Sequence, residues 1–254
     1  MPATPAVVVS HLSKYFPQLE LRHLLTLRRP PGVWALREVE FALEKGELLS
    51  IVGPNGSGKT TLIKLIATLL LPTRGRILVQ GHDTRLNPLA VKRRLGFITS
   101  NEESFYGRLS GWQNLSFFAQ LQNLDPGTAV PPVVKTLGLE PYLNRRFFSL
   151  STGIKRRFDI ARGLLHQPEI LLLDEPTTNL DPISAVEVRQ LLAQIRDRGK
   201  TIIMVTHRLE EVQKLGGRLA LMLDGRLREI RPGAEESLED LYCRVVAEGG
   251  HGPA

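Results

Sequence analysis

A glycine-rich segment, GPNGSGKT at residues 53–60, has residue types and spacing that could bind a phosphate. It fits the pattern G-x-x-x-x-G-K-[ST], and it lies between an apolar run at residues 48–52 and an expected helix at 60–70. Glycines let backbone N–H groups turn inward around a phosphate, and the helix N-terminus adds partial positive charge. Lys59 would reach the β- and γ-phosphates of a nucleotide, and Thr60 would offer its hydroxyl to Mg²⁺. The predicted binding residues are Gly53, Pro54, Asn55, Gly56, Ser57, Gly58, Lys59, Thr60 and Thr61.

Two adjacent carboxylates end another apolar run, ILLLDE at residues 170–175. Charge at the end of a buried strand is costly unless a metal ion or water is held there. Asp174 fits a Mg²⁺ ligand acting through water, and Glu175 fits the group that polarises an attacking water. A strand followed by an acidic helix cap would be the preferred interpretation of this segment alone. Together with the phosphate-binding loop, the pair predicts nucleotide hydrolysis.

The stretch LSTGIKRR at residues 150–157 precedes an expected amphipathic helix. On its own, Ser151 is a typical helix N-cap. A serine and a glycine at a helix N-terminus also make an anion site. The position of this stretch shortly before the carboxylate pair favours the anion site.

Composition narrows the class of protein. The chain has 254 residues, 42% of them apolar, so a substantial core is expected. Its net charge is +7, with arginines gathered at residues 22–29, 74–94 and 145–157. This pattern predicts a solvated basic surface or an anionic partner, namely a nucleotide, a nucleic acid or an acidic membrane face. The single cysteine, Cys243, excludes an internal disulfide framework and suits a reducing cytoplasm.

Neither a membrane span nor a signal peptide is predicted. The most apolar run, residues 62–71, contains Lys64 and is too short to cross a bilayer. The N-terminus lacks a basic segment followed by an apolar one. If the protein acts at a membrane, we expect another chain to provide the spans.

Short apolar runs predict the strands that position the candidate residues. Buried strands are expected at 77–79, 96–99, 170–173 and 201–206, with further strands at 7–9, 39–43 and 48–52. Asp224-Gly225 between the runs 219–223 and 226–230 predicts a hairpin. Residues 17–33, rich in Pro, Leu and Arg, predict an inserted loop or short helix, and residues 110–166 predict mostly helix.

The ordered set GPNGSGKT, LSTGIKRR, ILLLDEPTTNLDP and VTH resembles the nucleotide-binding subunit of ATP-binding cassette (ABC) transporters over nearly the whole chain. The resemblance implies an α/β fold with a P-loop NTPase core, made of a mixed sheet with flanking helices, an inserted helical subdomain and an N-terminal antiparallel β subdomain. We expect a single ABC ATPase domain at residues 1–248 and a flexible tail at 249–254. Within the domain, the core would span about 1–99 and 167–248, and the helical subdomain about 100–166.

The family's signature motif, usually L-S-G-G-Q, is matched by LSTGI at residues 150–154. Thr152 and Ile154 depart from the motif, whereas Ser151 and Gly153, the positions expected to contact phosphate, are kept. In this family the signature helix of one chain completes the ATP site of another. The resemblance therefore implies that hydrolysis requires a homodimer.

The resemblance assigns three further positions. Asn179-Leu180-Asp181 resembles the D-loop, which places Asp181 at the nucleotide. His207, after TIIMVT, takes the position of the histidine that contacts the γ-phosphate, so it joins Glu175 as a catalytic candidate. An aromatic ring near the N-terminus generally holds the adenine, and Phe16 in LSKYF is expected to do so.

The family's hinge loop begins with a glutamine that reaches the Mg²⁺ and links the core to the helical subdomain. In LGFITSNEES this position falls on Ser100, whose side chain is shorter than that of glutamine. Either a bridging water or Asn101 substitutes, or the contact is absent. Ser100 is thus a third candidate for the metal site, beside Thr60 and Asp174. Phe105 and Tyr106 are expected to supply apolar surface facing a permease.

Within the family, ATLLLPTRGRILVQGHD, RLSGWQNL and SLEDLY are similar to ATPase subunits of type-2 exporters. We expect an ATP- and Mg²⁺-dependent ATPase that works as a homodimer with separate transmembrane permease subunits and without nucleic acid. It would be cytoplasmic and peripheral on the inner face of the cell membrane. A soluble ABC-type ATPase acting on nucleic acid or the ribosome is the alternative, because the basic charge permits it. A nucleotide-binding module that barely hydrolyses is a third possibility, because the signature motif is altered.

Overall fold

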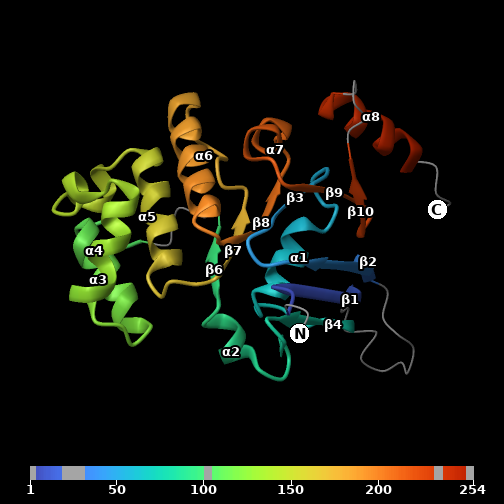
Figure 1. Ribbon diagram of the computed structural model, residues 1–254, viewed down its shortest axis with the longest axis horizontal. Coiled ribbons are helices and arrows are strands. Elements are labelled where there is room, and N and C mark those ends of the chain that lie inside the picture. The colour runs from blue at the N-terminus through green and yellow to red at the C-terminus, as the bar shows by residue number, and fades with distance from the viewer. Residues whose placement is uncertain (1–3, 19–31, 100–104, 232–236, 250–254) are drawn as a thin grey trace.

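The computed structural model describes residues 4–18, 32–99, 105–231 and 237–249 (Figure 1). Within these residues an antiparallel sheet has the strand order β2-β1-β4-β5, and a mixed sheet has the order β10-β9-β3-β8-β7-β6. Along the chain the elements are β1 (Val7–Pro17), β2 (Gly32–Leu43), β3 (Leu48–Val52), α1 (Lys59–Ile66), β4 (Arg74–Val79), β5 (His82–Asp83), α2 (Pro88–Lys92), β6 (Leu95–Ile98), α3 (Gly111–Leu121), α4 (Pro126–Leu137), α5 (Thr152–Leu164), β7 (Ile170–Asp174), α6 (Pro182–Asp197), β8 (Thr201–Thr206), α7 (Leu209–Leu215), β9 (Arg218–Leu223), β10 (Arg226–Ile230) and α8 (Leu238–Gly249).

The mixed sheet is built on parallel strands. β9, β3, β8, β7 and β6 run parallel, and β10 pairs antiparallel with β9 at the edge. Every residue of β3, β7 and β8 is buried. These strands are continuously apolar because both faces of the sheet are covered. The sheet and its flanking helices confirm the expected α/β fold.

Side-chain alternation divides the core between the two faces of this sheet. Leu49 and Ile51 of β3 pack with Leu62 and Ile66 of α1, which lies between the two sheets (Figure 1). On the opposite face, Leu171 and Leu173 of β7 join the cluster formed with α5 and α6. Because successive residues of a strand point to opposite faces, one short strand supplies both layers.

Helices α3, α4 and α5 lie together at one end of the molecule (Figure 1). Ser110 begins α3 with a capping box, in which its hydroxyl accepts from the N–H of Gln113 and the Gln113 side chain accepts from the N–H of Ser110. Helix α5 also packs on β6 and α6. It therefore connects the helical end to the mixed sheet. No helix in the described part of the chain is long and apolar enough to span a bilayer.

The hairpin prediction is confirmed, because β9 pairs antiparallel with β10 and the turn residues Asp224 and Gly225 have φ values of 46° and 76°. The helix expected at 60–70 ends earlier, at Ile66, because Thr68 adopts a φ of 60°. The ends of the segment 17–33 are strand rather than loop, since Pro17 of β1 pairs with Gly32 of β2. Residues 19–31 of that segment, and residues 250–254 of the expected tail, lie outside the described residues.

Candidate functional site

The loop between β3 and α1 borders a cavity of about 250 Å³, here called the phosphate-loop cavity. At Gly58 the chain has a φ of 109°, and a Cβ there would collide with the carbonyl oxygen of Ala35. Only glycine fits both constraints without strain. The cavity is lined by Ala35, Asn55, Gly56, Ser57, Gly58, Lys59, Thr60, Thr61 and Glu175.

Lys59 is buried at the base of the loop, with 6% of its surface exposed. Its ammonium donates to the carbonyl oxygens of Gly53 at 2.7 Å and Pro54 at 2.9 Å. Burial lowers the pKa of Lys59, while the nearby charges of Glu175 and Asp174 act in the opposite direction. An ammonium held only by backbone carbonyls can exchange them for phosphate oxygens, which are stronger acceptors.

Thr60 and Asp174 meet although they are 114 residues apart in the sequence, because α1 follows β3 and Asp174 ends β7. The Thr60 hydroxyl donates to Oδ1 of Asp174 at 3.2 Å. Burial raises the pKa of Asp174, and the bond from Thr60 partly offsets this. A divalent cation would remove the cost of this buried charge. One hydroxyl and one carboxylate suit Mg²⁺, which takes its remaining ligands from phosphate oxygens and water.

Glu175 lines the phosphate-loop cavity and directly follows β7. Its backbone has a φ of 53°, and its N–H donates to the carbonyl oxygen of Val205 at 2.9 Å. Its carboxylate lies 2.9 Å from Nδ1 of His207 and accepts from the Thr178 hydroxyl at 3.1 Å. The two catalytic candidates of the sequence are therefore in direct contact. A carboxylate held in place beside an imidazole can orient a water and accept its proton.

A residue that sequence analysis missed lies behind this pair. Glu211 of α7 is 1% exposed, and it accepts a hydrogen bond from the hydroxyl of Thr177, two residues after Glu175. Burial raises the pKa of Glu211, with the bonds from Thr177 and Thr206 acting in the opposite direction. Glu211 shares the buried face of α7 with Val212 and Leu215. The helical spacing of these three residues in the sequence could therefore have identified Glu211 as buried.

Ser151, Gly153 and Asp181 lie apart from the phosphate-loop cavity, and none of them lines it. Ser151 is the exposed N-cap of α5, where its hydroxyl accepts from the N–H of Ile154. Asp181 caps α6 by accepting from the N–H groups of Ile183 and Ser184, both at 3.0 Å. The bonds from Ser184 lower the pKa of Asp181. Gly153 is buried against α6, since a Cβ there would collide with the Ser184 side chain.

Phe16 lies on β1, with 39% of its surface exposed and the ammonium of Lys14 5.0 Å from its ring centroid. It pairs with Val33 of β2, two residues before Ala35. The register between β1 and β2 shifts at Ala35, because Lys14 pairs with Leu36 and Tyr15 pairs with Trp34. Ala35 lines the phosphate-loop cavity, so the ring lies along the strand that leads to it.

The loop around residue 100 is described only at its ends, and Ser100 lies outside the described residues. The expectation that Phe105 faces a permease is corrected. Its ring stacks on Phe147 with centroids 4.4 Å apart and contacts the edge of Phe118 at 5.2 Å. It is half-buried in the core of the helical end, whereas Tyr106 remains 53% exposed.

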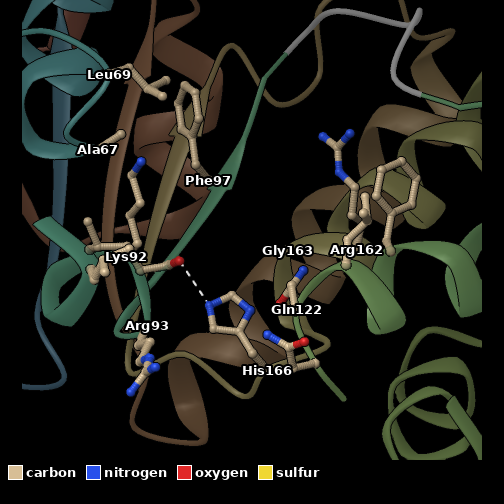
Figure 2. A pocket seen from close by; sticks show the side chains of 14 residues that line it. Ala67, Leu69, Lys92, Arg93, Phe97, Gln122, Arg162, Gly163 and His166 are labelled. Carbon is tan, nitrogen blue, oxygen red and sulfur yellow. Dashed lines mark hydrogen bonds between the residues drawn. The ribbon is translucent and has the colours of Figure 1, made fainter. Parts of the chain in front are cut away.

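A groove of about 530 Å³ runs between the helical end and the mixed sheet. Figure 2 shows Lys92, Arg93 and Phe97 on one wall, with Arg162, His166 and Gln122 on the other. The ionisable residues that line it are all basic, namely Lys92, Arg93, Arg162 and His166. Its other lining residues are Ala67, Leu69, Leu89, Leu95, Phe97, Phe118, Leu121, Gln122, Asn123 and Gly163.

The groove combines polar contacts with an exposed apolar rim. Nε2 of His166 lies 3.0 Å from the carbonyl oxygen of Leu95, the contact drawn in Figure 2. The guanidinium of Arg162 lies 5.3 Å from the ring centroid of Phe118. Leu69, Leu89 and Leu121 are 53%, 73% and 64% exposed. Exposed leucines gathered at a groove are typical of an interaction surface.

Comparison with known proteins agrees with this geometry. The family model described as ABC transporter matches residues 36–178. The chain is 39% identical over 209 residues to the ABC transporter ATP-binding protein NatA of Bacillus subtilis, covering 81% of this chain and 84% of NatA. It is 34% identical over 219 residues to the doxorubicin resistance ATP-binding protein DrrA of Mycobacterium tuberculosis, covering 84% of this chain and 65% of DrrA.

Among solved structures, the dimeric post-hydrolysis state of the ATP-binding cassette MJ0796, bound to ADP and Pi, is similar to this chain. The TM-score is 0.73 at 26% identity, and the match covers 89% of this chain and 100% of that one. Fold, ordered motifs and relatives therefore agree. The chain belongs to the ABC transporter family, as an ATP-binding and ATP-hydrolysing subunit.

Proposed function

We propose that this chain hydrolyses Mg·ATP as a homodimer on the inner face of the cell membrane and thereby drives export through a separate permease. The proposal rests above all on the convergence of Lys59, Asp174, Glu175 and His207 at one phosphate-binding loop. The loop N–H groups and Lys59 bind the phosphates, and Thr60 and Asp174 hold Mg²⁺. Mg·ATP, when bound, supplies the reactive phosphoanhydride and the positive charge that neutralises its oxygens.

Glu175 orients the attacking water and accepts its proton, because it lines the phosphate-loop cavity beside the phosphate-binding residues. His207 holds that carboxylate through Nδ1 at 2.9 Å, which leaves the other ring nitrogen available for the γ-phosphate. Lys59 stabilises the negative charge that spreads over the phosphate oxygens during transfer. Phe16 provides a ring on which the adenine stacks, at the strand that borders the loop.

The homodimer is proposed because the binding residues fall into two separate groups. Ser151 and Asp181 lie at exposed helix N-termini, away from the phosphate-loop cavity of their own chain. In a second copy they would face the open side of that cavity and add N–H donors to the phosphates. The dimeric arrangement of the MJ0796 cassette supports this proposal.

The groove is proposed to take an intracellular segment of the permease. The leucines at its rim suit an apolar segment, and Lys92 and Arg93 call for a carboxylate on that segment, since Arg162 already lies 3.6 Å from Asp159. Export, rather than import, is proposed from the resemblance to type-2 exporters and from DrrA, a doxorubicin resistance protein. A nucleic-acid partner is not supported by the names of these transporter relatives.

Glu175→Gln tests the hydrolytic role, because it keeps size and hydrogen bonding but removes the base. We expect ATP binding to survive, turnover to fall by about 10²-fold or more, and an ATP-bound dimer to accumulate. The measurements are steady-state phosphate release, nucleotide affinity and sedimentation with ATP. Glu210→Gln is the matched control, since Glu210 is an exposed carboxylate of α7 whose nearest ion pair is 4.0 Å long. Near-normal turnover in Glu175→Gln would refute the role of Glu175.

A further inference from the structure

Arg156 is a buried cation in α5 that none of the roles above uses. Only 5% of its surface is exposed, although Lys155 and Arg157 on either side are partly exposed. A buried guanidinium is costly unless its donors are paired. The contacts of Arg156 therefore show what this position does.

The planar guanidinium of Arg156 joins two backbone carbonyls from different segments. Nη1 donates to the carbonyl oxygen of Thr99 at 2.5 Å, and Nη2 donates to that of Glu175 at 3.4 Å. The carboxylate of Asp159, one turn along the same helix, lies 3.9 Å away. Thr99 follows β6, and Glu175 follows β7, its parallel neighbour. One side chain thus spans the adjacent ends of two strands.

We propose that Arg156 is a positioning residue, which fixes the signature helix α5 to the backbone of Glu175 and so sets the direction of the Glu175 carboxylate. This inference rests on the proposed catalytic role of Glu175. The Glu175 side chain contacts His207, its N–H donates to Val205, and its carbonyl accepts from the N–H of Thr178 and from Arg156, which is the contact that comes from α5. A shift of α5 would therefore pull directly on the residue that orients the water.

The bridge requires arginine in particular. Arginine presents several donors in a fixed plane, whereas lysine offers a single nitrogen on a flexible stem. Arg156→Lys therefore keeps the charge and loses the simultaneous contact with both carbonyls. Arg157 supplies the control in the same helix turn, since its guanidinium pairs with Glu187 of α6 at 2.5 Å and is not among the residues lining the phosphate-loop cavity.

The experiment compares Arg156→Lys, Arg156→Gln and Arg157→Gln in the full-length chain. We expect Arg156→Lys to lower kcat by about tenfold while KM for ATP changes by less than about threefold. Affinity for a fluorescent ATP analogue and the thermal unfolding temperature should match those of Arg157→Gln. Arg156→Gln should lower kcat further. Should Arg156→Gln fail to fold, Arg156→Lys still decides the question.

A double substitution separates positioning from a merely structural role. Arg156 and His207 both restrain Glu175, so the losses of kcat caused by Arg156→Lys and His207→Ala should not simply multiply. In the double variant, the fold-loss of kcat should be at least about threefold smaller than the product of the two single fold-losses. Arg157→Gln and His207→Ala should combine independently. Unchanged kcat in Arg156→Lys, or a loss fully explained by weaker ATP binding or by unfolding, would overturn the inference. Glu175→Gln tests the proposed catalytic role separately. Normal turnover in that variant would refute the role of Glu175, independently of the results for the Arg156 variants.

Discussion

The phosphate-loop cavity and the groove differ in how their side chains are partnered. In the cavity, Lys59 bonds to loop carbonyls, Asp174 to Thr60, and Glu175 to His207. The groove instead exposes leucines beside basic side chains. Hydrogen bonds within the chain hold a reactive site in shape before its ligand arrives, whereas exposed apolar surface gains free energy only when another molecule covers it. This difference supports the proposal that the cavity carries the chemistry and the groove carries the partner contact.

The largest loss of turnover is expected from a substitution in the surface that a second chain is proposed to place over the phosphate-loop cavity. Ser151→Asp keeps an efficient N-cap for α5 and adds a negative charge where a second chain's phosphates are proposed to bind. We expect turnover to fall by about 10²-fold, with the unfolding temperature nearly unchanged. Ser110→Asp is the matched control, because Ser110 is likewise a helix N-cap, at the start of α3.

Mixing two inactive chains sharpens this prediction. Lys59→Ala removes the phosphate-binding lysine from one chain, and Ser151→Asp places a negative charge in the signature motif of the other. A mixed dimer has one site with both parts intact, so combining the proteins should recover up to about a quarter of the wild-type rate. No recovery, together with proof that the chains associate, would contradict a site shared between two copies.

A smaller effect is expected in the groove, and it should spare the chemistry. Leu89→Asp places a charge on a side chain that is 73% exposed at the groove rim. Basal ATPase activity should stay within about twofold, since surface substitutions rarely disturb a fold, while stimulation by the permease in vesicles should fall about fivefold. Leu86→Asp is the control, because Leu86 is 79% exposed and does not line the groove. Equal loss in both variants would exclude the groove as the docking surface.

The smallest effect concerns the carboxyl group behind the cavity. The pKa of Glu211 is raised in the folded chain, mainly by burial, with a further rise from the nearby charge of Glu175 and a lowering from Arg208. A raised folded pKa contributes stability that is present below the unfolded value and is lost as pH rises. Glu211→Gln should therefore unfold about 2–4 °C above the wild type at pH 8, and the difference should shrink toward pH 5. A variant that is less stable than wild type at pH 8 would show that Glu211 functions as a charged group.

Much of the fold could be predicted from sequence because its signals are local. A run of apolar residues predicts a buried strand, and Asp224-Gly225 predicts a turn, since each depends on a few neighbouring residues. The end of α1 could not be predicted in this way. The apolar run continues past Ile66, but Thr68 adopts a left-handed conformation that helix propensity does not favour.

The sequence by itself determined which chemistry is present, because the phosphate loop and the carboxylate pair are contiguous motifs whose residue types have few other uses. Tertiary structure alone decided which distant groups act on them. Parallel strands bring their carboxyl ends to one edge, and this places His207 against Glu175 and Arg156 across both Thr99 and Glu175. It also left Phe105 half-buried, although sequence analysis placed it on the surface, because its ring packs in a cluster with Phe118 and Phe147. Such contacts follow from packing between segments far apart in the chain, and no local pattern records them.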